Sequence, residues 1–298
     1  MKIRMVIVIM SGFILQSCMT LDFTKHQHSY KPIEPEFKNI NVAFVLGGGG
    51  AKALAHVGVM EELINAGIQP DLIVGCSAGA VVGGLFANNP DLDHIKNILL
   101  HKKREDLLSI SLRYLPFGLS NSEELETFLE QELDASKFEG LGLPFISVAT
   151  NLEFGNLTAF GTGPVVPAIQ ASAAYPGVFL PVKIEDQYFV DGGVAEPLPV
   201  STAKHFGAKF IIAIDLSGSL TDEFPNHALG IVKRCLEISY KRQSTLTGKG
   251  ADYIIKVPFT NEGTFDDEMN YQVYELGRQA GRQAIADIKK KLQAKNLG

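Results

Sequence analysis

The sequence has no tryptophan, few cysteines and no surplus of basic residues. Each shortage argues against a particular structural feature or partner. Without tryptophan, the usual aromatic anchor at a membrane interface is missing. A formal net charge of −6 argues against a nucleic-acid partner, because no basic surplus is available to neutralise phosphates. Beyond the N-terminal segment, only Cys76 and Cys235 remain of the three cysteines. A disulfide between them is possible in an exported chain, but we expect both to be small packing residues.

The first residues lack acidic side chains and read as an export signal. Lys2 and Arg4 precede an apolar run up to Leu15, which is too short to span a membrane and is typical of a secretory signal over residues 1–17. The run ends in Leu-Gln-Ser-Cys18, which resembles a bacterial lipobox and implies a lipid on Cys18; a plain signal peptide with a fortuitous cysteine is the alternative. Residues 18–39 then form a polar tether. We therefore expect a protein of the bacterial cell envelope, anchored to a membrane by this lipid on the periplasmic side.

From residue 40 onward, uninterrupted apolar runs alternate with helical stretches. Strands are predicted at residues 41–46, 71–74, 144–150, 187–190, 209–215 and 252–257. Helices are predicted at 52–66, 78–88 and 269–292, with a further helical stretch over 91–133. Apolar strands that alternate with helices indicate an α/β fold with a mostly parallel central sheet covered by helices on both faces, in three layers. With no internal repeat and no low-complexity segment, residues 40–298 are predicted to form one domain.

A serine occupies a cramped corner between the second predicted strand and the helix after it. Gly75-Cys76-Ser77-Ala78-Gly79 is a G-x-S-x-G sequence, which in this strand-to-helix context is typical of a nucleophile elbow. The flanking glycines relieve the clashes of so sharp a turn, and the helix N-terminus places partial positive charge near a developing oxyanion. A purely structural turn is the alternative. The context favours Ser77 as a nucleophile.

Four consecutive glycines follow the first predicted strand and begin a helix, an arrangement typical of an anion site built from backbone N–H groups. A Walker loop is excluded, because Lys52 lies between two alanines and no hydroxyl is available for magnesium. A dinucleotide fingerprint is excluded too, since the next strand leads into the serine corner instead of ending in an acidic residue. We therefore predict that Gly48, Gly49 and Gly50 form an oxyanion hole.

A third block, Asp191-Gly192-Gly193, ends a predicted strand and leaves the carboxylate unobstructed. Alone it would be a turn. Together with the other blocks, it makes the chain resemble the patatin-like phospholipases over roughly residues 43–204. Gly48 to Lys52 is similar to the glycine-rich block of that family, Gly75 to Gly79 to its serine elbow, and Asp191 to Gly193 to its aspartate block. The segment 171–181, with Ser172 and Pro176, is similar to a further family block. Ala53 departs from the glycine that is common in the family after the basic residue.

The resemblance implies a serine acyl hydrolase that uses a Ser–Asp dyad. Ser77 would attack an ester carbonyl and Asp191 would accept its proton, with Lys52, Gly75, Gly79, Gly192 and Gly193 supporting the motifs. Phospholipids, lysophospholipids or related acyl esters at a membrane surface would be the substrates, and neither a cofactor nor a metal is implied. An acyltransferase or thioesterase on the same scaffold and a non-catalytic binding module of the envelope remain alternatives. The sequence does not indicate an oligomeric state.

Three further features have two interpretations each. His56, on the helix after the glycines, is either a packing histidine or the base of a triad, and the family pattern does not use it as a catalytic residue. Lys233, Arg234, Lys241 and Arg242 are expected to be an ordinary solvated helix surface, with a basic face toward anionic lipid as the alternative. The stretch 91–133 contains LRYLPFGLS and is either a lid or acyl-chain wall, or core.

Overall fold

A computed structural model describes residues 27–28, 34–102, 106–111, 114, 118–218, 220, 225–259 and 270–297. Their strands form one sheet with the order β1-β6-β7-β4-β3-β2-β8-β9, and β5 pairs with β4 beside this path. The strands are β1 (Gln27–His28), β2 (Val42–Leu46), β3 (Leu72–Cys76), β4 (Phe145–Asn151), β5 (Leu157–Phe160), β6 (Val182–Ile184), β7 (Gln187–Asp191), β8 (Phe210–Asp215) and β9 (Tyr253–Lys256).

The sheet is mixed but mostly parallel, as the sequence predicts. The central strands β4, β3, β2, β8 and β9 run parallel to one another, whereas β5 and β7 lie antiparallel to β4 and β6 lies antiparallel to β7. The strands β2, β3, β4 and β8 are buried along their whole length. Burial on both faces explains why their sequences are continuous apolar runs without alternation.

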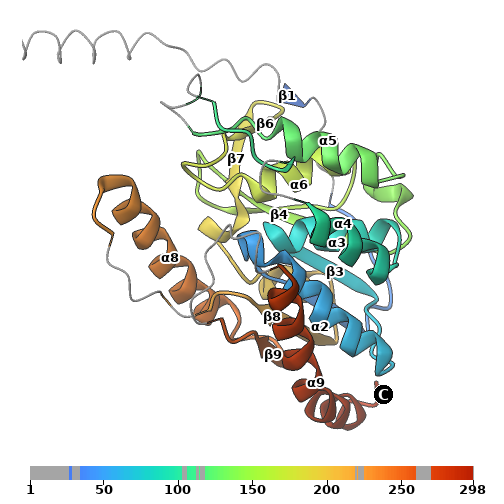
Figure 1. The fold of residues 1–298 in the computed structure, drawn as a ribbon. Helices are drawn as coiled ribbons and strands as arrows, with labels where there is room; N and C mark the ends of the chain where they lie inside the picture. The colour runs from blue at the N-terminus through green and yellow to red at the C-terminus, as the bar shows by residue number, and fades with distance from the viewer. Residues whose placement is uncertain are drawn as a thin grey trace, which may run out of the picture.

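Helices lie on both faces of the sheet, but unequally (Figure 1). The helices are α2 (Ala53–Asn65), α3 (Ala78–Asn88), α4 (Leu92–His101), α5 (Glu123–Glu132), α6 (Val165–Ala173), α7 (Val200–His205), α8 (Ala228–Thr247) and α9 (Asn270–Ala294). The larger core cluster takes side chains from α2, α3, α4, α5, α6 and α9. The second cluster is smaller and is covered mainly by α7 and by Phe37 and Ile40.

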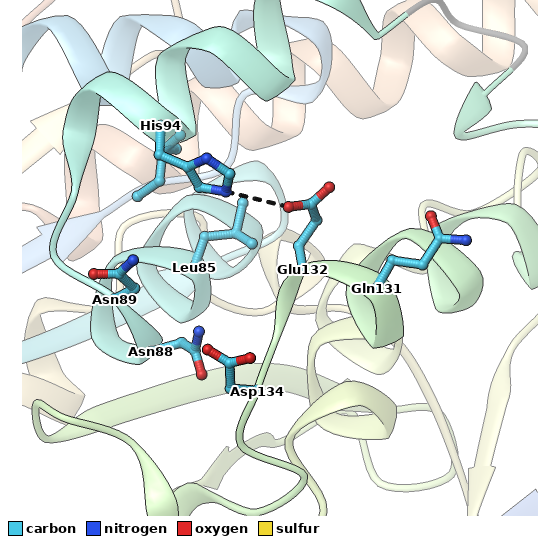
Figure 2. A pocket seen from close by; sticks show the side chains of 8 residues that line it. Leu85, Asn88, Asn89, His94, Gln131, Glu132 and Asp134 are labelled. Atoms are coloured by element: carbon cyan, nitrogen blue, oxygen red, sulfur yellow. Dashed lines mark hydrogen bonds and ion pairs between the residues drawn. The ribbon is translucent and has the colours of Figure 1, made fainter.

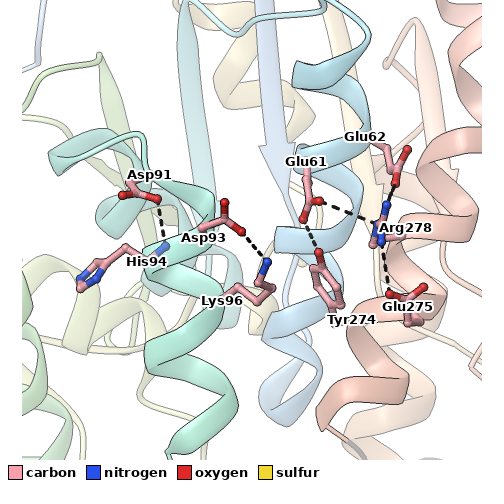
Figure 3. Close-up of polar contacts among 9 residues, drawn as sticks. All are labelled: Glu61, Glu62, Asp91, Asp93, His94, Lys96, Tyr274, Glu275 and Arg278. Atoms are coloured by element: carbon pink, nitrogen blue, oxygen red, sulfur yellow. Dashed lines mark hydrogen bonds and ion pairs between the residues drawn. The ribbon is translucent and has the colours of Figure 1, made fainter.

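The long C-terminal helix α9 is fixed against α2 by close backbone contact and by ion pairs. A Cβ on Gly58 would lie 2.3 Å from the Tyr274 carbonyl oxygen, so the two helices touch through their backbones. At the edge of this contact, Arg278 pairs with Glu62 at 2.7 Å, and the Tyr274 hydroxyl donates to Glu61 (Figure 3). This packing holds α2, and with it the end of the glycine loop, against the sheet.

Two expectations about the organisation of the chain need correction. Among the described residues of the stretch 91–133, α-helix is confined to α4 and α5, and Leu108, Ser111 and Gly118 lie in irregular chain between them. Of LRYLPFGLS, only residue 114 and residues 118–120 are described. The segment expected to be a tether belongs partly to the domain, because β1 pairs with β6 and the Phe37 ring packs edge-on against Phe206 at 5.5 Å.

The predicted signal segment and Cys18 lie outside the described residues. Within those residues, no helix has the length and apolar character to cross a membrane.

Candidate active site

Ser77 sits at the turn between β3 and α3 in a conformation that serine rarely adopts. Its backbone angles are φ +54° and ψ −121°, in a region that favours glycine. Strain of this kind costs about 1–3 kcal/mol and persists only where the surroundings hold it. Here the Ser77 amide donates to the Ser172 hydroxyl at 2.8 Å, which fixes the corner from α6. The side chain is 8% exposed and lies at the N-terminus of α3.

The glycines around Ser77 allow the strand and the helix to approach closely. A Cβ on Gly79 would lie 2.1 Å from the Leu46 carbonyl oxygen, and a Cβ on Gly75 would lie 2.6 Å from the Ala80 Cα. Any larger residue would separate α3 from β2 and β3. The G-x-S-x-G spacing is therefore a steric requirement of this corner.

Asp191, the last residue of β7, is completely buried beside this corner. Its Oδ1 accepts a hydrogen bond from the Gly193 amide at 2.7 Å, and its Oδ2 has no hydrogen-bond partner among the described residues. Burial raises the pKa of Asp191 to about 6, although the nearby Ser77 hydroxyl and the Gly193 amide both favour the charged form. The ionised Asp191 is therefore a stronger base than an ordinary aspartate, whose pKa is 3.8.

The strand β4 brings these two residues together. It pairs with β3 on one side, where Cys76 lies opposite Val148, and with β7 on the other, where Asp191 lies opposite Ala149. The Cys76 sulfur lies 4.0 Å from Asp191 Oδ1. Ser77, just after β3, and Asp191, at the end of β7, therefore lie on either side of β4 at almost the same level, although they are far apart in the sequence.

The glycine loop lies beside Ser77, and not all of its backbone amides are available as oxyanion donors. The Gly48 amide donates to the Pro197 carbonyl at 3.0 Å, which corrects the expectation that Gly48 serves as an oxyanion donor. The amides of Gly49 and Gly50 have no partner among the described residues, and Gly50 has a φ of +57° that favours glycine. These two amides are therefore the candidate oxyanion donors.

His56 lies on α2 and is hydrogen-bonded to the start of this loop at Gly47. The ring is fully buried, and its Nε2 lies 2.8 Å from the Gly47 carbonyl oxygen. Burial lowers the pKa of His56 to about 4, so the ring is neutral at physiological pH and donates from Nε2. The other ring nitrogen, Nδ1, is buried without a hydrogen-bond partner among the described residues, so neither nitrogen is bonded to Ser77. His56 is therefore an anchor of the loop, and the structure does not support it as the base of a triad.

A family model described as Patatin-like phospholipase matches residues 44–204, which is more than half of the chain. The chain belongs to the patatin-like phospholipase family.

The relatives of this patatin-like chain are longer proteins. An uncharacterised NTE family protein of Mycobacterium bovis is 34% identical over 180 residues, which cover 60% of this chain and 49% of the relative. A lysophospholipase of Emericella nidulans is 32% identical over 188 residues, which cover 62% of this chain and 12% of the relative. Among solved structures, VipD from Legionella pneumophila is similar with a TM-score of 0.47 and 14% identity, over 92% of this chain and 72% of that one.

The patatin-like site has supporting residues that the motifs alone do not reveal. The Thr150 hydroxyl donates to the Asp191 carbonyl at 2.9 Å and so holds the turn after β7. A Cβ on Gly193 would lie 2.8 Å from the Tyr240 ring, which comes from α8. The Tyr240 ring packs edge-on against Tyr175, with 5.6 Å between the ring centres. No local signal in the sequence places α8 against this site.

Three other predicted residues have different outcomes. The Lys52 ammonium lies over the Phe259 ring, 4.6 Å from its centre. Cys76 is buried, as predicted, whereas the prediction that Cys235 packs internally is wrong because this residue is exposed on α8. Both thiols are free, so the disulfide alternative is contradicted.

A polar cavity of about 250 Å³ lies away from this site, at the far end of α3 (Figure 2). Asn88, His94, Glu132 and Asp134 are among its lining residues. Asn88 is eleven positions after Ser77 on the same helix, about 16 Å along its axis. Within the described residues, no group of three or more histidine, cysteine, aspartate or glutamate side chains could hold a metal ion.

Proposed function

We propose that this chain is a serine acyl hydrolase that cleaves the acyl esters of phospholipids or lysophospholipids through Ser77 and Asp191. The observation that carries the proposal is the pairing of a strained, nearly buried serine with a buried carboxylate whose pKa is about 6. Membership of the patatin-like phospholipase family supports this reaction class, and the name of the Emericella nidulans relative supports a lysophospholipid substrate.

The acylation step follows from the positions of the polar atoms. The Ser77 Oγ attacks the ester carbonyl carbon while its proton moves to the unpartnered Oδ2 of Asp191. The carbonyl oxygen becomes an oxyanion that the Gly49 and Gly50 amides stabilise. The intermediate collapses to an acyl-enzyme, and the departing alcohol takes the proton from Asp191.

Deacylation repeats these roles with water as the nucleophile. Asp191, again ionised, accepts a proton from the water molecule that attacks the acyl-enzyme. The resulting tetrahedral intermediate expels the Ser77 Oγ, which recovers the proton from Asp191 and releases the fatty acid. Because the aspartate cycles between two states, its pKa near the working pH suits both directions of proton transfer.

The N-terminal segment adds a proposed location. A lipid on Cys18 would hold the enzyme at the bacterial envelope membrane, on the periplasmic side. Gln27 in β1 lies nine positions after Cys18, so the chain between them spans at most about 30 Å. Metabolic fatty-acid labelling that marks the protein but not a Cys18→Ala variant would support this anchor, and equal labelling of both would refute it.

The catalytic proposal is tested with a long-chain fluorophosphonate, which labels activated serines without knowledge of the substrate. We expect labelling of the full chain, none in Ser77→Ala, a sharp decrease in Asp191→Asn, and no change in Ser109→Ala, an exposed serine outside the site. Release of fatty acid from lysophosphatidylcholine, measured beside acyl transfer to added alcohols, then separates hydrolysis from transfer. Labelling that persists in Ser77→Ala would show that another residue is the nucleophile.

A further inference from the structure

The helix α8 exposes apolar side chains to solvent, whereas a helix that only packs on its own domain would bury them. Its exposed side includes Ile231 at 47%, Val232 at 56%, Ile238 at 47% and Leu246 at 50% of full exposure. Cys235 is exposed as well, and residues 231, 235, 238, 242 and 246 recur at helical spacing along one side. Figure 1 shows α8 projecting from the body of the molecule. An apolar stripe on the solvent side is typical of an interaction surface.

The polar side of α8 faces the domain and fixes the helix there. The Ser244 hydroxyl donates to Asp215 Oδ1 at 2.9 Å, and Ser244 is buried. A Cβ on Gly248, just after the helix, would lie 3.0 Å from Leu198. These contacts lie in the C-terminal half of α8, whereas the exposed Ile231 and Val232 lie in the N-terminal half.

The helix also connects this apolar stripe to the catalytic dyad. Tyr240 packs from α8 against Gly193 and Tyr175, directly beside Asp191. Val194, the next residue after Gly193, is 37% exposed. Leu152 and Phe154 are 54% and 67% exposed in the turn after β4, at the same edge of the sheet that carries Ser77. Exposed apolar side chains therefore occur both on α8, which contacts the site through Tyr240, and at the sheet edge that carries Ser77.

The charge on α8 indicates which kind of partner its exposed face contacts. The helix carries Lys233, Arg234, Lys241 and Arg242 against one acidic residue, Glu237, which pairs with Lys233 and Arg234 at 3.7 Å, so its net charge is positive. Arg242 is exposed between Ile238 and Leu246 on the apolar side itself. Two copies of this chain paired through α8 would bring these basic groups together at a cost, whereas the anionic headgroups of a bilayer complement them.

We infer that the exposed face of α8 docks on an anionic lipid surface and so presents the dyad to membrane-borne acyl esters. The inference rests on the proposed function for its biological purpose, but the docking itself needs no catalysis. It also gives the basic residues of α8 a role beyond a solvated surface. The apolar side chains enter the headgroup region, and the exposed Lys233 and Arg242 contact the phosphates above them.

Cys235 provides a local readout in the middle of the docking face. In the full chain with Cys18→Ser, an environment-sensitive fluorophore is attached to Cys235, while Cys76 stays unlabelled because it is buried. Vesicles of phosphatidylcholine and phosphatidylglycerol are then added, with and without spin-labelled lipid. We expect a blue shift and quenching by the spin label. A matched probe on α9, made with Ala286→Cys and Cys235→Ser, gives neither.

Two sets of variants separate the apolar and the electrostatic contributions. The first set is the triple variant Ile231→Ser, Val232→Ser, Ile238→Ser. Vesicle binding, measured by the fluorophore on Cys235, should weaken at least about tenfold, because three half-exposed apolar side chains no longer enter the lipid. The matched control Gln279→Ser, Gln283→Ser, Ala286→Ser on the exposed side of α9 leaves binding unchanged. Lys241→Gln with Arg242→Gln weakens binding to anionic vesicles but not to pure phosphatidylcholine.

Hydrolysis of a water-soluble short-chain ester distinguishes this inference from the proposed function. The serine variants on α8 should retain that activity and the native circular dichroism. A chain that hydrolyses the soluble ester but shows no vesicle response at Cys235 overturns the docking inference and leaves the proposed function intact. A response at Cys235 that depends on protein concentration instead of lipid, with dimers in light scattering, overturns it in favour of a contact between copies. Vesicle docking without any esterase activity would refute the proposed function alone.

Discussion

Asp191→Asn should make the protein more stable while it removes the activity. The aspartate is fully buried, and its pKa of about 6 compares with an ordinary value of 3.8. A raised pKa means that the folded state holds the proton more tightly than the unfolded state, so ionisation of Asp191 destabilises the fold as the pH rises from 3.8 through 6. The asparagine side chain has nearly the same shape and does not ionise.

The shift of about two pKa units corresponds to about 3 kcal/mol of unfolding free energy at pH 7.5. At pH 4.5, where the wild-type carboxylate is protonated in the folded state, the same linkage leaves only about 1 kcal/mol. Urea unfolding of wild type and Asp191→Asn at both pH values measures the two differences. Esterase activity at pH 7.5 should fall about 100-fold or more, since the general base is lost.

The control is Asp186→Asn, an exposed aspartate close by in the sequence, which should change the stability by less than about 0.5 kcal/mol at either pH. Two results would refute the reasoning. One is an Asp191→Asn variant no more stable than wild type at pH 7.5. The other is a gain that stays the same at both pH values, because neither outcome is compatible with a buried charge as the source of the effect.

Three further predictions follow from the same site. The kcat/KM for a soluble ester should be about tenfold lower at pH 5 than at pH 7, because Asp191 must be ionised to accept a proton, and a flat profile down to pH 5 would exclude it as the base. Gly79→Ala should lower the unfolding free energy by about 3 kcal/mol or leave the chain insoluble, since its Cβ would lie 2.1 Å from the Leu46 carbonyl oxygen. Thermal unfolding measures the change, and the control is Gly142→Ala, whose Cβ would have 3.5 Å of space. His56→Phe should lower kcat about tenfold and the unfolding free energy by about 1–3 kcal/mol, because it leaves the Gly47 carbonyl without a donor. His56→Gln keeps a donor and should recover part of both losses. An equal kcat in wild type and both variants would show that His56 does not position the loop.

The sequence predicts the central sheet well because its strands are buried on both faces. Each predicted central strand lies within two residues of its observed bounds, and the helix at 78–88 matches α3. The short strands β1 and β6 escape prediction, since two or three residues carry no readable period. The continuous helical stretch expected over 91–133 is not observed, since the described residues Leu108, Ser111 and Gly118 between α4 and α5 are irregular.

The motifs locate Ser77 and Asp191 but not the contacts that surround and position them. The spacing around Ser77 and Asp191 is a local property, so the sequence reveals it. The hydrogen bond that occupies the Gly48 amide comes from Pro197, and the anchor of the loop comes from His56; both depend on tertiary contacts. The exposed position of Cys235 is also unpredictable from its own sequence, because α8 turns its apolar side outward.

The placement of Ser77 and Asp191 on either side of β4 has a consequence for how this sequence can vary. The register of one central strand sets their separation, so an insertion or deletion within β4 would move one partner past the other by a whole residue. The turn Leu152–Gly155 that follows β4 is free of this constraint, since its length does not enter the register. Sequence variation can therefore accumulate at that exposed turn and on α8, while Ser77 and Asp191 keep a fixed separation.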